Sequence, residues 1–395
     1  MAQGKSETKN GKKSAGKAKV KEPVAAATVS DAAAKPAKVA PAPVPALRAD
    51  VASLPAYIPG ARGDGRRMWK LSSNENPALP LPGVLAAIAD AAADVNRYPD
   101  MYAVELTEAI ARKLAVGTDR VVCANGSVAA LGHILSAFCL PGDEVVYPWR
   151  SFEAYPIAVQ VSGATSVKVP LTADARHDLP EMAAAVTDHT RVVLTCSPNN
   201  PTGPALRDAE FREFLASVPR RVVVVLDEAY VEYVRDPDVV DALAILRDFP
   251  NVVLLRTFSK AYGLAGLRVG YAVGEPALIA GIRAVSTPFG VNALAQRAAV
   301  ESLRLERHLL DRVSETVSER DRVLHAVRRA GWDVPETQAN FFWLALGRET
   351  TSFVAAADDA GLLVRGFPGD GVRVTLGEPE ANDAVVKLLR DMKKA

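Results

Sequence analysis

The sequence predicts an α/β protein in which a mostly parallel sheet presents polar residues at the carboxyl ends of its strands. Three apolar runs lead to this prediction, at residues 192–195, 222–226 and 252–255, and each is followed by polar or turn-forming residues. Short runs rich in β-branched residues are typical of strands that are buried on both faces of a parallel sheet. Open α/β sheets bind ligands at the carboxyl ends of their strands, so we expect the functional site there.

The turn after the third strand contains Lys260 among glycines and apolar residues. Such surroundings remove water from an amine and lower its pKa, which makes the amine a nucleophile that can form a Schiff base. Arg268 offers a planar set of donors that suits a phosphate, and Thr257 and Ser259 add hydroxyl groups. Considered alone, a Ser-Lys pair is more often an ordinary solvated loop segment.

The other two strands lead to residues that support a functional site. Asp227 follows the strand at 222–226, within the segment Asp-Glu-Ala-Tyr. Asn200 lies in the turn Ser-Pro-Asn-Asn-Pro-Thr-Gly (197–203), which follows the first strand. Three strand ends are therefore expected to bring an amide, a carboxylate and a lysine to the same edge of the sheet.

These segments, together with Ser-Lys-Ala-Tyr-Gly-Leu-Ala-Gly-Leu-Arg (259–268), resemble the signature motifs of fold type I, pyridoxal-phosphate-dependent aminotransferases. The resemblance is strongest to the branch of histidinol-phosphate and aromatic amino acid aminotransferases, and it extends from about residue 47 to the C-terminus. It implies a large domain around the mostly parallel sheet and a smaller α+β domain. It also implies pyridoxal 5'-phosphate as the cofactor and a cytoplasmic homodimer with shared active sites.

The resemblance assigns a role to each matching residue. Lys260 would hold the cofactor as an internal aldimine and would move the proton during transamination. Asp227 would pair with the protonated pyridine nitrogen, and Asn200 and Tyr230 would bond to the phenolic oxygen of the ring. A turn-forming role for Asn200 and a packing role for Tyr230 are the alternatives. The cofactor phosphate would be bound by Gly126, Ser127, Thr257, Ser259 and Arg268, and no metal is expected.

Further residues are assigned to the cofactor ring, the substrate and the dimer. Phe152 would stack on the cofactor ring, and Tyr98 would reach across a dimer interface to the phosphate bound by the partner. Arg373 would clamp the α-carboxylate of the substrate through two parallel hydrogen bonds. The substrate would also meet Tyr57, Asn76 and Asn200. Turn or packing roles are the alternatives for Tyr98 and Tyr57, and for Arg365 we prefer a surface position to a second anion contact.

Local patterns predict several elements around these residues. Residues 82–93 read as a helix, and a strand at 121–124 is followed by a helix that begins with Asn125, Gly126 and Ser127. The amino end of that helix would suit a phosphate, and its buried face would contain Val128, Leu131, Leu135 and Phe138. A long helical region is expected over 283–330, followed by strands at 339–344, 362–365 and 372–376.

The chain of 395 residues divides into four predicted parts. Residues 1–46 contain nine lysines, three acidic residues and no aromatic residue, and with a net charge of +6 they should form a disordered tail. An arm at 47–75, a large cofactor-binding domain at 76–283 and a small domain at 284–395 would follow. The remaining 38 basic and 43 acidic residues give this folded part a net charge of −5.

The composition argues against several classes of protein. The tail has neither the apolar run of a secretory signal nor the arginines of a mitochondrial transit peptide, and no run is long enough to span a membrane. The three cysteines have no metal-binding spacing, which fits a reducing cytoplasm. We expect no nucleic-acid or membrane partner, although a basic tail leaves an anionic surface open as an alternative.

The expected reaction is ping-pong transamination between aromatic amino acids and 2-oxo acids, with glutamate and 2-oxoglutarate as a partner pair. The segment Trp-Arg-Ser-Phe-Glu-Ala-Tyr (149–155) favours the aromatic branch. Histidinol-phosphate:2-oxoglutarate transamination is the alternative, because an arginine that holds a carboxylate can also hold a phosphate. A decarboxylase acting on an amino-acid phosphate and a ligand-sensing regulator are weaker alternatives, and the tail is too short for the DNA-binding domain of the regulator.

Overall fold

The structure is a computed structural model that describes residues 45–54 and 68–393. The predicted tail, apart from residues 45 and 46, and Tyr57 of the predicted arm lie outside the described residues. The only described helix of the arm segment is the short α1 (Ala49–Ala52), where an extended chain was expected. Among the described residues, no helix is long and apolar enough to cross a membrane.

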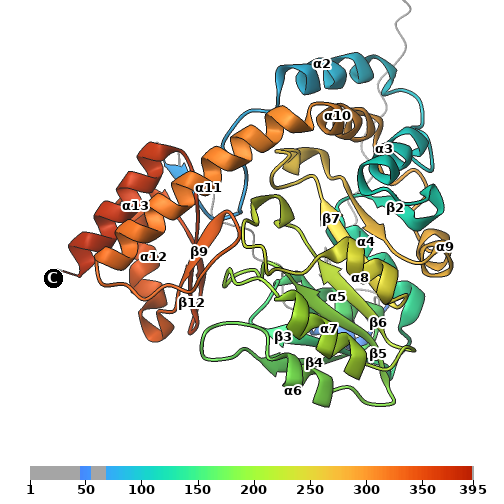
Figure 1. Cartoon of the computed structure of the whole chain (residues 1–395), viewed down its shortest axis with the longest axis horizontal. Coiled ribbons are helices and arrows are strands. Elements are labelled where there is room, and N and C mark those ends of the chain that lie inside the picture. The colour runs from blue at the N-terminus through green and yellow to red at the C-terminus, as the bar shows by residue number, and fades with distance from the viewer. Residues whose placement is uncertain (1–44, 55–67, 394–395) are drawn as a thin grey trace, which may run out of the picture. The chain divides into compact units, whose positions relative to one another are not determined.

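A seven-stranded sheet lies at the centre of the fold (Figure 1), in the order β2-β8-β7-β6-β5-β3-β4. The contacts from β4 through β3, β5 and β6 to β7 are parallel, whereas β8 runs antiparallel to both β7 and β2. The predicted mostly parallel α/β sheet is therefore confirmed. The strands are β2 (Val121–Ala124), β3 (Glu144–Trp149), β4 (Thr165–Pro170), β5 (Thr190–Cys196), β6 (Val223–Asp227), β7 (Val252–Thr257) and β8 (Gly270–Val273).

Two apolar cores cover the two faces of this sheet. Side chains of β5 alternate between them, since Val192 and Leu194 belong to one core and Val193 to the other. This is the pattern of a strand that is buried on both faces. The first core is completed by α4 (Ser127–Phe138), α5 (Ala154–Ser162) and α9 (Pro276–Ala284). The second contains α3 (Val104–Leu114), α6 (Leu179–Ala184), α7 (Asp208–Ser217) and α8 (Ala242–Asp248).

A second, antiparallel sheet has the strand order β11-β12-β9 and a core of its own. Leu71, which lies in the predicted arm segment, is fully buried in this core. A two-stranded parallel sheet joins β1 (Trp69–Lys70) to β10 (Leu362–Leu363), so the segment at 69–70 packs beside a segment nearly 300 residues later. The other elements here are β9 (Phe341–Leu344), β11 (Arg365–Phe367), β12 (Gly371–Thr375), α12 (Thr350–Asp359) and α13 (Pro379–Met392).

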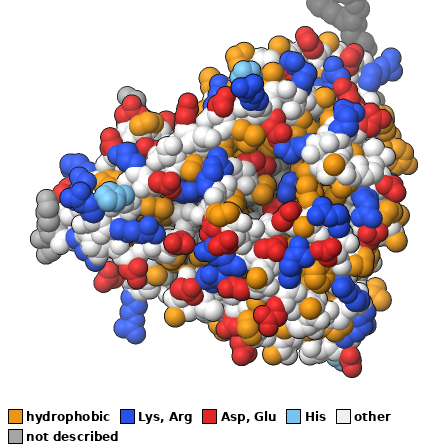
Figure 2. Space-filling view, in the orientation of Figure 1, with side chains coloured by type: hydrophobic (Ala, Val, Ile, Leu, Met, Phe, Trp, Pro, Cys, Tyr) orange, Lys and Arg blue, Asp and Glu red, His pale blue; other side chains and the backbone are white. Residues whose placement is uncertain are grey.

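The helix α11 (Glu306–Arg329) connects the two regions (Figure 1). Val313 and Val317 in its first half belong to a core of the central sheet, whereas Val323 and Val327 belong to the core of the antiparallel sheet. One long amphipathic helix therefore packs against both regions. On the face shown in Figure 2, acidic and basic side chains are mixed.

Two of the predicted helices differ in detail. The helical region expected over 283–330 is interrupted at 285–292, where Pro288 and Gly290 disfavour a helix and Asn292 caps α10 (Ala293–Arg304). Val128 was expected on the buried face of α4 but is 40% exposed, because it lies in the first turn beside a cavity. The remaining helices are α2 (Pro82–Ala91) and the short η1 (Ala92–Asp94), η2 (Thr118–Arg120), η3 (Val231–Tyr233), η4 (Ala265–Leu267) and η5 (Gly347–Glu349).

Candidate active site

A cavity of about 400 Å³ lies at the carboxyl ends of β5, β6 and β7. This position follows from the parallel strands, which all deliver their next residues to one edge of the sheet. The lining includes most of the residues that the sequence singled out. These are Ser127, Phe152, Asn200, Asp227, Tyr230, Thr257, Ser259, Lys260, Arg268 and Arg373.

Lys260 follows β7, and its side chain reaches the segment after β1, which forms part of the cavity wall. Its Nζ donates a hydrogen bond to the carbonyl oxygen of Ser73 at 2.9 Å and lies 5.9 Å from the centre of the Tyr230 ring. Burial lowers the pKa of Lys260 to about 7, and the nearby charges of Arg373 and Arg268 act in the same direction. The amine is therefore substantially neutral near neutral pH, as a nucleophile or a base must be.

Asp227 is the last residue of β6 and is almost completely buried. Its Oδ2 accepts a hydrogen bond from the Tyr155 hydroxyl at 3.0 Å, whereas Oδ1 is buried without a hydrogen-bond partner among the described residues. Burial raises the pKa of Asp227 to about 7. A buried carboxylate oxygen of this kind is ready to accept a bond from a cationic N–H group in the cavity.

A candidate anion-binding cluster lines the cavity where α4 begins. Arg268 Nη1 donates to Ser259 Oγ at 3.2 Å, and Thr257 Oγ1 donates to the same oxygen at 2.9 Å. Gly126, with φ of +88°, precedes α4, and a Cβ there would lie 2.6 Å from Arg268 Nη2. The missing side chain leaves the first N–H groups of α4, starting at Ser127, accessible beside a guanidinium, which suits a phosphate.

Arg373, on β12, brings the antiparallel sheet to the cavity. Its Nη1 donates to Asn200 Oδ1 and its Nη2 to the carbonyl oxygen of Ser72, both at 2.6 Å. Tyr230 is held in turn by Asn74, whose Nδ2 donates to the phenolic oxygen at 2.9 Å. These contacts fix the orientation of a guanidinium that suits a carboxylate.

Two described residues that were predicted for the site, Asn76 and Tyr98, do not line the cavity. Asn76 does not line the cavity, since its Nδ2 donates to the carbonyl oxygen of Ala261 at 3.0 Å and the cavity instead meets Glu75 of the same segment. Tyr98 is 83% exposed and stacks on Phe289 with 4.7 Å between ring centres. Tyr57 is outside the described residues.

No role was predicted for Tyr155 or Glu153, and a surface position was preferred for Arg365. Tyr155, which bonds to Asp227, and Glu153 stand in the segment that was used only to separate the two branches. Arg365 was expected at the surface, but only 11% of its side chain is exposed and it lines the cavity with Glu153. The available sign in the sequence was a polar residue at every second position around Phe152, at 151, 153 and 155.

A prediction follows for Tyr155, whose pKa burial raises well above its ordinary value, so that the hydroxyl stays protonated as a donor. In the variant Tyr155→Phe, Asp227 loses this hydrogen bond. Because the bond favours the charged carboxylate, its loss should raise the pKa of Asp227 further. We expect the acidic limb of the kcat profile to move to higher pH and turnover at pH 7 to fall about tenfold.

The matched control is Tyr147→Phe, since the Tyr147 ring packs 6.0 Å from that of Tyr155 and its hydroxyl is buried but does not bond to Asp227. Both variants should unfold at similar temperatures. An equal change of the pH profile in both variants would contradict a specific role for the Tyr155 hydroxyl.

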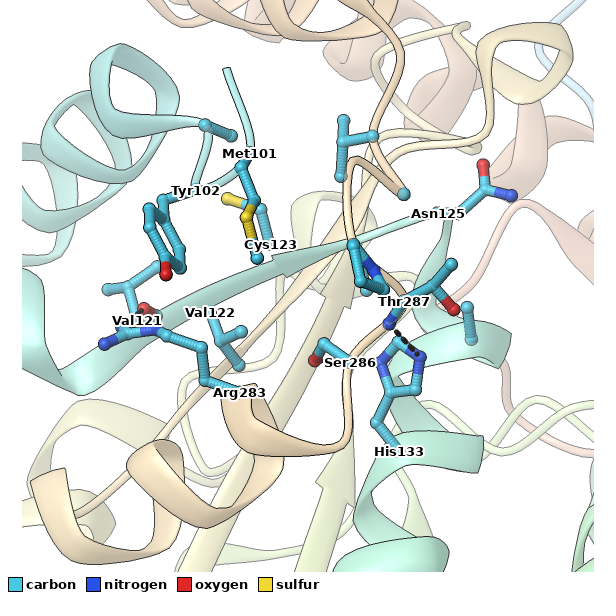
Figure 3. A pocket seen from close by; sticks show the side chains of 16 residues that line it. Met101, Tyr102, Val121, Val122, Cys123, Asn125, His133, Arg283, Ser286 and Thr287 are labelled. Atoms are coloured by element: carbon cyan, nitrogen blue, oxygen red, sulfur yellow. Dashed lines mark hydrogen bonds between the residues drawn. The ribbon is translucent and has the colours of Figure 1, made fainter. Parts of the chain in front are cut away.

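A second cavity, of about 200 Å³, lies between β2 and the segment 285–292 (Figure 3). It contains none of the predicted site residues. His133 faces Ser286 and Thr287 there, with its Nδ1 3.2 Å from Ser286 Oγ, and burial lowers its pKa. Arg283 Nη2 donates to the carbonyl oxygen of Val121 at 2.8 Å. These bonds lie within the protein and do not form a reactive group, so we consider the first cavity the active-site candidate.

Comparisons with known proteins agree with this choice. Residues 66–389 match the family described as "Aminotransferase class I and II". The aromatic amino acid aminotransferases of Streptomyces avermitilis and Thermobifida fusca are each 54% identical over 352 residues, which cover 89% of this chain and 98% of each relative.

Solved structures show the same fold. The histidinol-phosphate aminotransferase of Sinorhizobium meliloti, in complex with pyridoxal-5'-phosphate, superimposes with a TM-score of 0.81 at 27% identity, covering 89% of this chain and 99% of that one. A Thermus thermophilus aspartate aminotransferase reaches a TM-score of 0.76 at 21% identity, with coverage of 89% and 100%. The predicted fold type I architecture and the predicted family are confirmed.

Proposed function

The chain belongs to the class I and II aminotransferase family, whose cofactor is pyridoxal 5'-phosphate, and we propose that it transfers amino groups between aromatic amino acids and 2-oxo acids. The observation that carries this proposal is the 54% identity to aromatic amino acid aminotransferases along 98% of their length. Phe152 in the cavity lining is consistent with an aromatic ligand.

The residues of the cavity fit the cofactor. The unpartnered Oδ1 of Asp227 suits its protonated ring nitrogen, and the cluster of Arg268, Ser259 and the amino end of α4 suits its phosphate. Lys260 lines the same cavity and would be the covalent attachment point. When bound, pyridoxal phosphate supplies an electron-accepting ring that stabilises negative charge at the Cα of the substrate.

In the proposed mechanism the protein positions the substrate and moves one proton. Arg373 binds the α-carboxylate, and its bond to Asn200 fixes the plane of the guanidinium. The neutral amine of Lys260 takes the proton from the Cα of the amino donor. In the second half of the reaction it returns a proton to the Cα of the amino acid that is formed from the 2-oxo acid. The hydrogen bond from Tyr155 favours the charged form of Asp227, and we propose Asn200 and Tyr230 as the residues that contact the ring oxygen.

The low pKa of Lys260 predicts how cofactor uptake depends on pH. Only the neutral amine can bond to a carbonyl carbon, and with a pKa of about 7 the neutral fraction rises as the pH rises through 7. We expect the rate of cofactor binding by the cofactor-free protein to increase about tenfold between pH 6 and 8, with a midpoint near 7. Stopped-flow absorbance measures this rate, and a midpoint near the ordinary lysine value would contradict the assigned environment.

The substrate class is tested by presenting phenylalanine and histidinol phosphate side by side to the full-length holoenzyme. The measurement is the single-turnover rate at which the absorbance of the bound cofactor bleaches. We expect faster bleaching with phenylalanine. A preference for histidinol phosphate would favour the alternative function, in which Arg365 and Arg373 bind a phosphate.

We also propose that the enzyme is a homodimer in which Tyr98 reaches the active site of the partner. The exposed position of Tyr98 supports this, as do other apolar side chains close to it in the sequence, which include Val95, Met101 and Tyr102 at 64%, 43% and 58% exposure. A group of exposed apolar side chains of this kind is unusual on a surface that stays in contact with water. Sedimentation should give twice the chain mass, and Tyr98→Phe should raise the Kd of the cofactor about tenfold.

A further inference from the structure

Arg365 and Glu153 form an ion pair in the wall of the active-site cavity, and the mechanism above does not use it. Arg365 Nη2 lies 2.6 Å from Glu153 Oε1, and Nε donates to Oε2 at 3.2 Å. The two groups therefore meet through two parallel hydrogen bonds, the strongest arrangement for a guanidinium and a carboxylate. The exposed fractions of the side chains are 11% for Arg365 and 26% for Glu153, so water screens the pair only partly.

The antiparallel sheet places Arg365 next to the proposed anchor of the substrate. Arg365 on β11 is the direct register partner of Arg373 on β12. Residues opposite each other in an antiparallel pair project from the same face, with Cβ atoms about 4.5–5.5 Å apart. Both arginines line the cavity. Two neighbouring guanidinium groups suit a ligand with two anionic groups, such as a dicarboxylate.

Glu153 changes what the second guanidinium can bind. It precedes α5, directly after Phe152, and both residues line the same cavity as Arg365. The carboxylate of Glu153 occupies donors that a second carboxylate of a ligand would need. An uncharged aromatic side chain meets a pair with no net charge, whereas a dicarboxylate must displace Glu153 and then lies close to its negative charge.

We propose that Glu153 determines specificity by competing with the second carboxylate of a ligand for Arg365. The pair thereby favours ligands with an aromatic side chain. A dicarboxylate such as 2-oxoglutarate binds when its second carboxylate replaces the carboxylate of Glu153 at Arg365. This inference rests on the proposed function, because it takes Arg373 as the site of the α-carboxylate. It names a residue that acts on the substrate preference and leaves the proton transfer at Lys260 unchanged.

The test uses the full-length holoenzyme and two probes that cannot react. Glutarate has the two carboxylates and the carbon chain of 2-oxoglutarate, whereas 3-phenylpropanoate has one carboxylate and an aromatic ring. Calorimetric titration gives the Kd of each probe. In Glu153→Gln we expect the Kd of glutarate to fall about tenfold, because the competing charge is gone, and the Kd of 3-phenylpropanoate to stay within about twofold.

Two further variants make the result specific to the pair. Arg365→Gln should raise the Kd of glutarate, and adding Glu153→Gln to it should bring no gain, since the guanidinium is no longer there. The matched control is Glu275→Gln, which removes a carboxylate from an arginine pair outside the cavity, 2.8 Å from Arg120. This variant should leave both values unchanged. Thermal unfolding checks that each variant is folded.

Several results would overturn the proposal. They are a glutarate Kd in Glu153→Gln that is unchanged or higher, an equal gain for both probes, or a gain that persists without Arg365. Failure of the proposed function looks different, because the wild-type enzyme would then not bind 3-phenylpropanoate at all. In that case the glutarate measurements still decide whether Glu153 competes for Arg365.

Discussion

Replacing Lys260 with alanine should reduce turnover by at least about 10⁴-fold, the largest effect that we expect from a single substitution. Lys260 has two proposed tasks, covalent attachment of the cofactor and movement of the substrate proton, and alanine can perform neither. Among the described residues, its amine donates a hydrogen bond only to the Ser73 carbonyl oxygen, so the fold should survive its removal. The measurements are kcat with phenylalanine and the protein mass after borohydride reduction, which should show attached cofactor only in the wild type.

The control for this prediction is Lys168→Ala, because Lys168 is an exposed lysine over the Trp149 ring, away from the cavity. Its turnover should match that of the wild type. Turnover of Lys260→Ala within about tenfold of the wild type would contradict the mechanism, since no other described lysine lines the cavity.

Asp227→Asn should have the second largest effect, a loss of about 10³-fold in kcat. Asparagine has nearly the same shape but cannot carry the negative charge that we propose would hold the ring nitrogen of the cofactor protonated. The electron-accepting capacity of the ring would then be largely lost. The Kd of the cofactor should also rise at least tenfold, because a buried charge pair is lost. Steady-state kinetics and fluorescence titration of the cofactor-free protein measure the two effects.

The sign of the stability change distinguishes this role from a structural one. In the cofactor-free protein burial raises the pKa of Asp227 to about 7, so the unfolded chain, with its lower pKa, favours the charged form. The buried carboxylate therefore costs stability above its unfolded pKa, and this cost reaches its full size above pH 7. Cofactor-free Asp227→Asn should unfold at an equal or higher temperature at pH 8, and Asp248→Asn, at an exposed ion pair, should change little. A marked loss of stability would indicate that Asp227 mainly supports the fold.

The sequence by itself was enough to predict the central strands and the motif residues at their ends. Buried parallel strands are continuous apolar runs, and the residues that follow them reach the same sheet edge whatever the strand order. The sites of Lys260, Asp227 and Asn200 could therefore be predicted from three short segments. The residues of the anion-binding cluster lie within one loop and one helix start, where local spacing is informative.

Only the tertiary structure decided which side chains meet across the cavity. Glu153 and Arg365 are 212 positions apart, and Tyr155 and Asp227 are 72 apart. Their contacts depend on the order of strands in the sheet and on the placement of β11 and β12 beside it. The exposure of Val128 likewise depends on the cavity beside α4.

The sequence thus determined the family and the fold class and predicted the candidate reactive residues, because these depend on short segments whose chemistry is local. The tertiary structure decided the partners of Asp227 and Arg365, because a pair of distant side chains is set by packing between elements. Those partners are the residues through which we expect the protein to adjust the charge and the ligand preference of its active site.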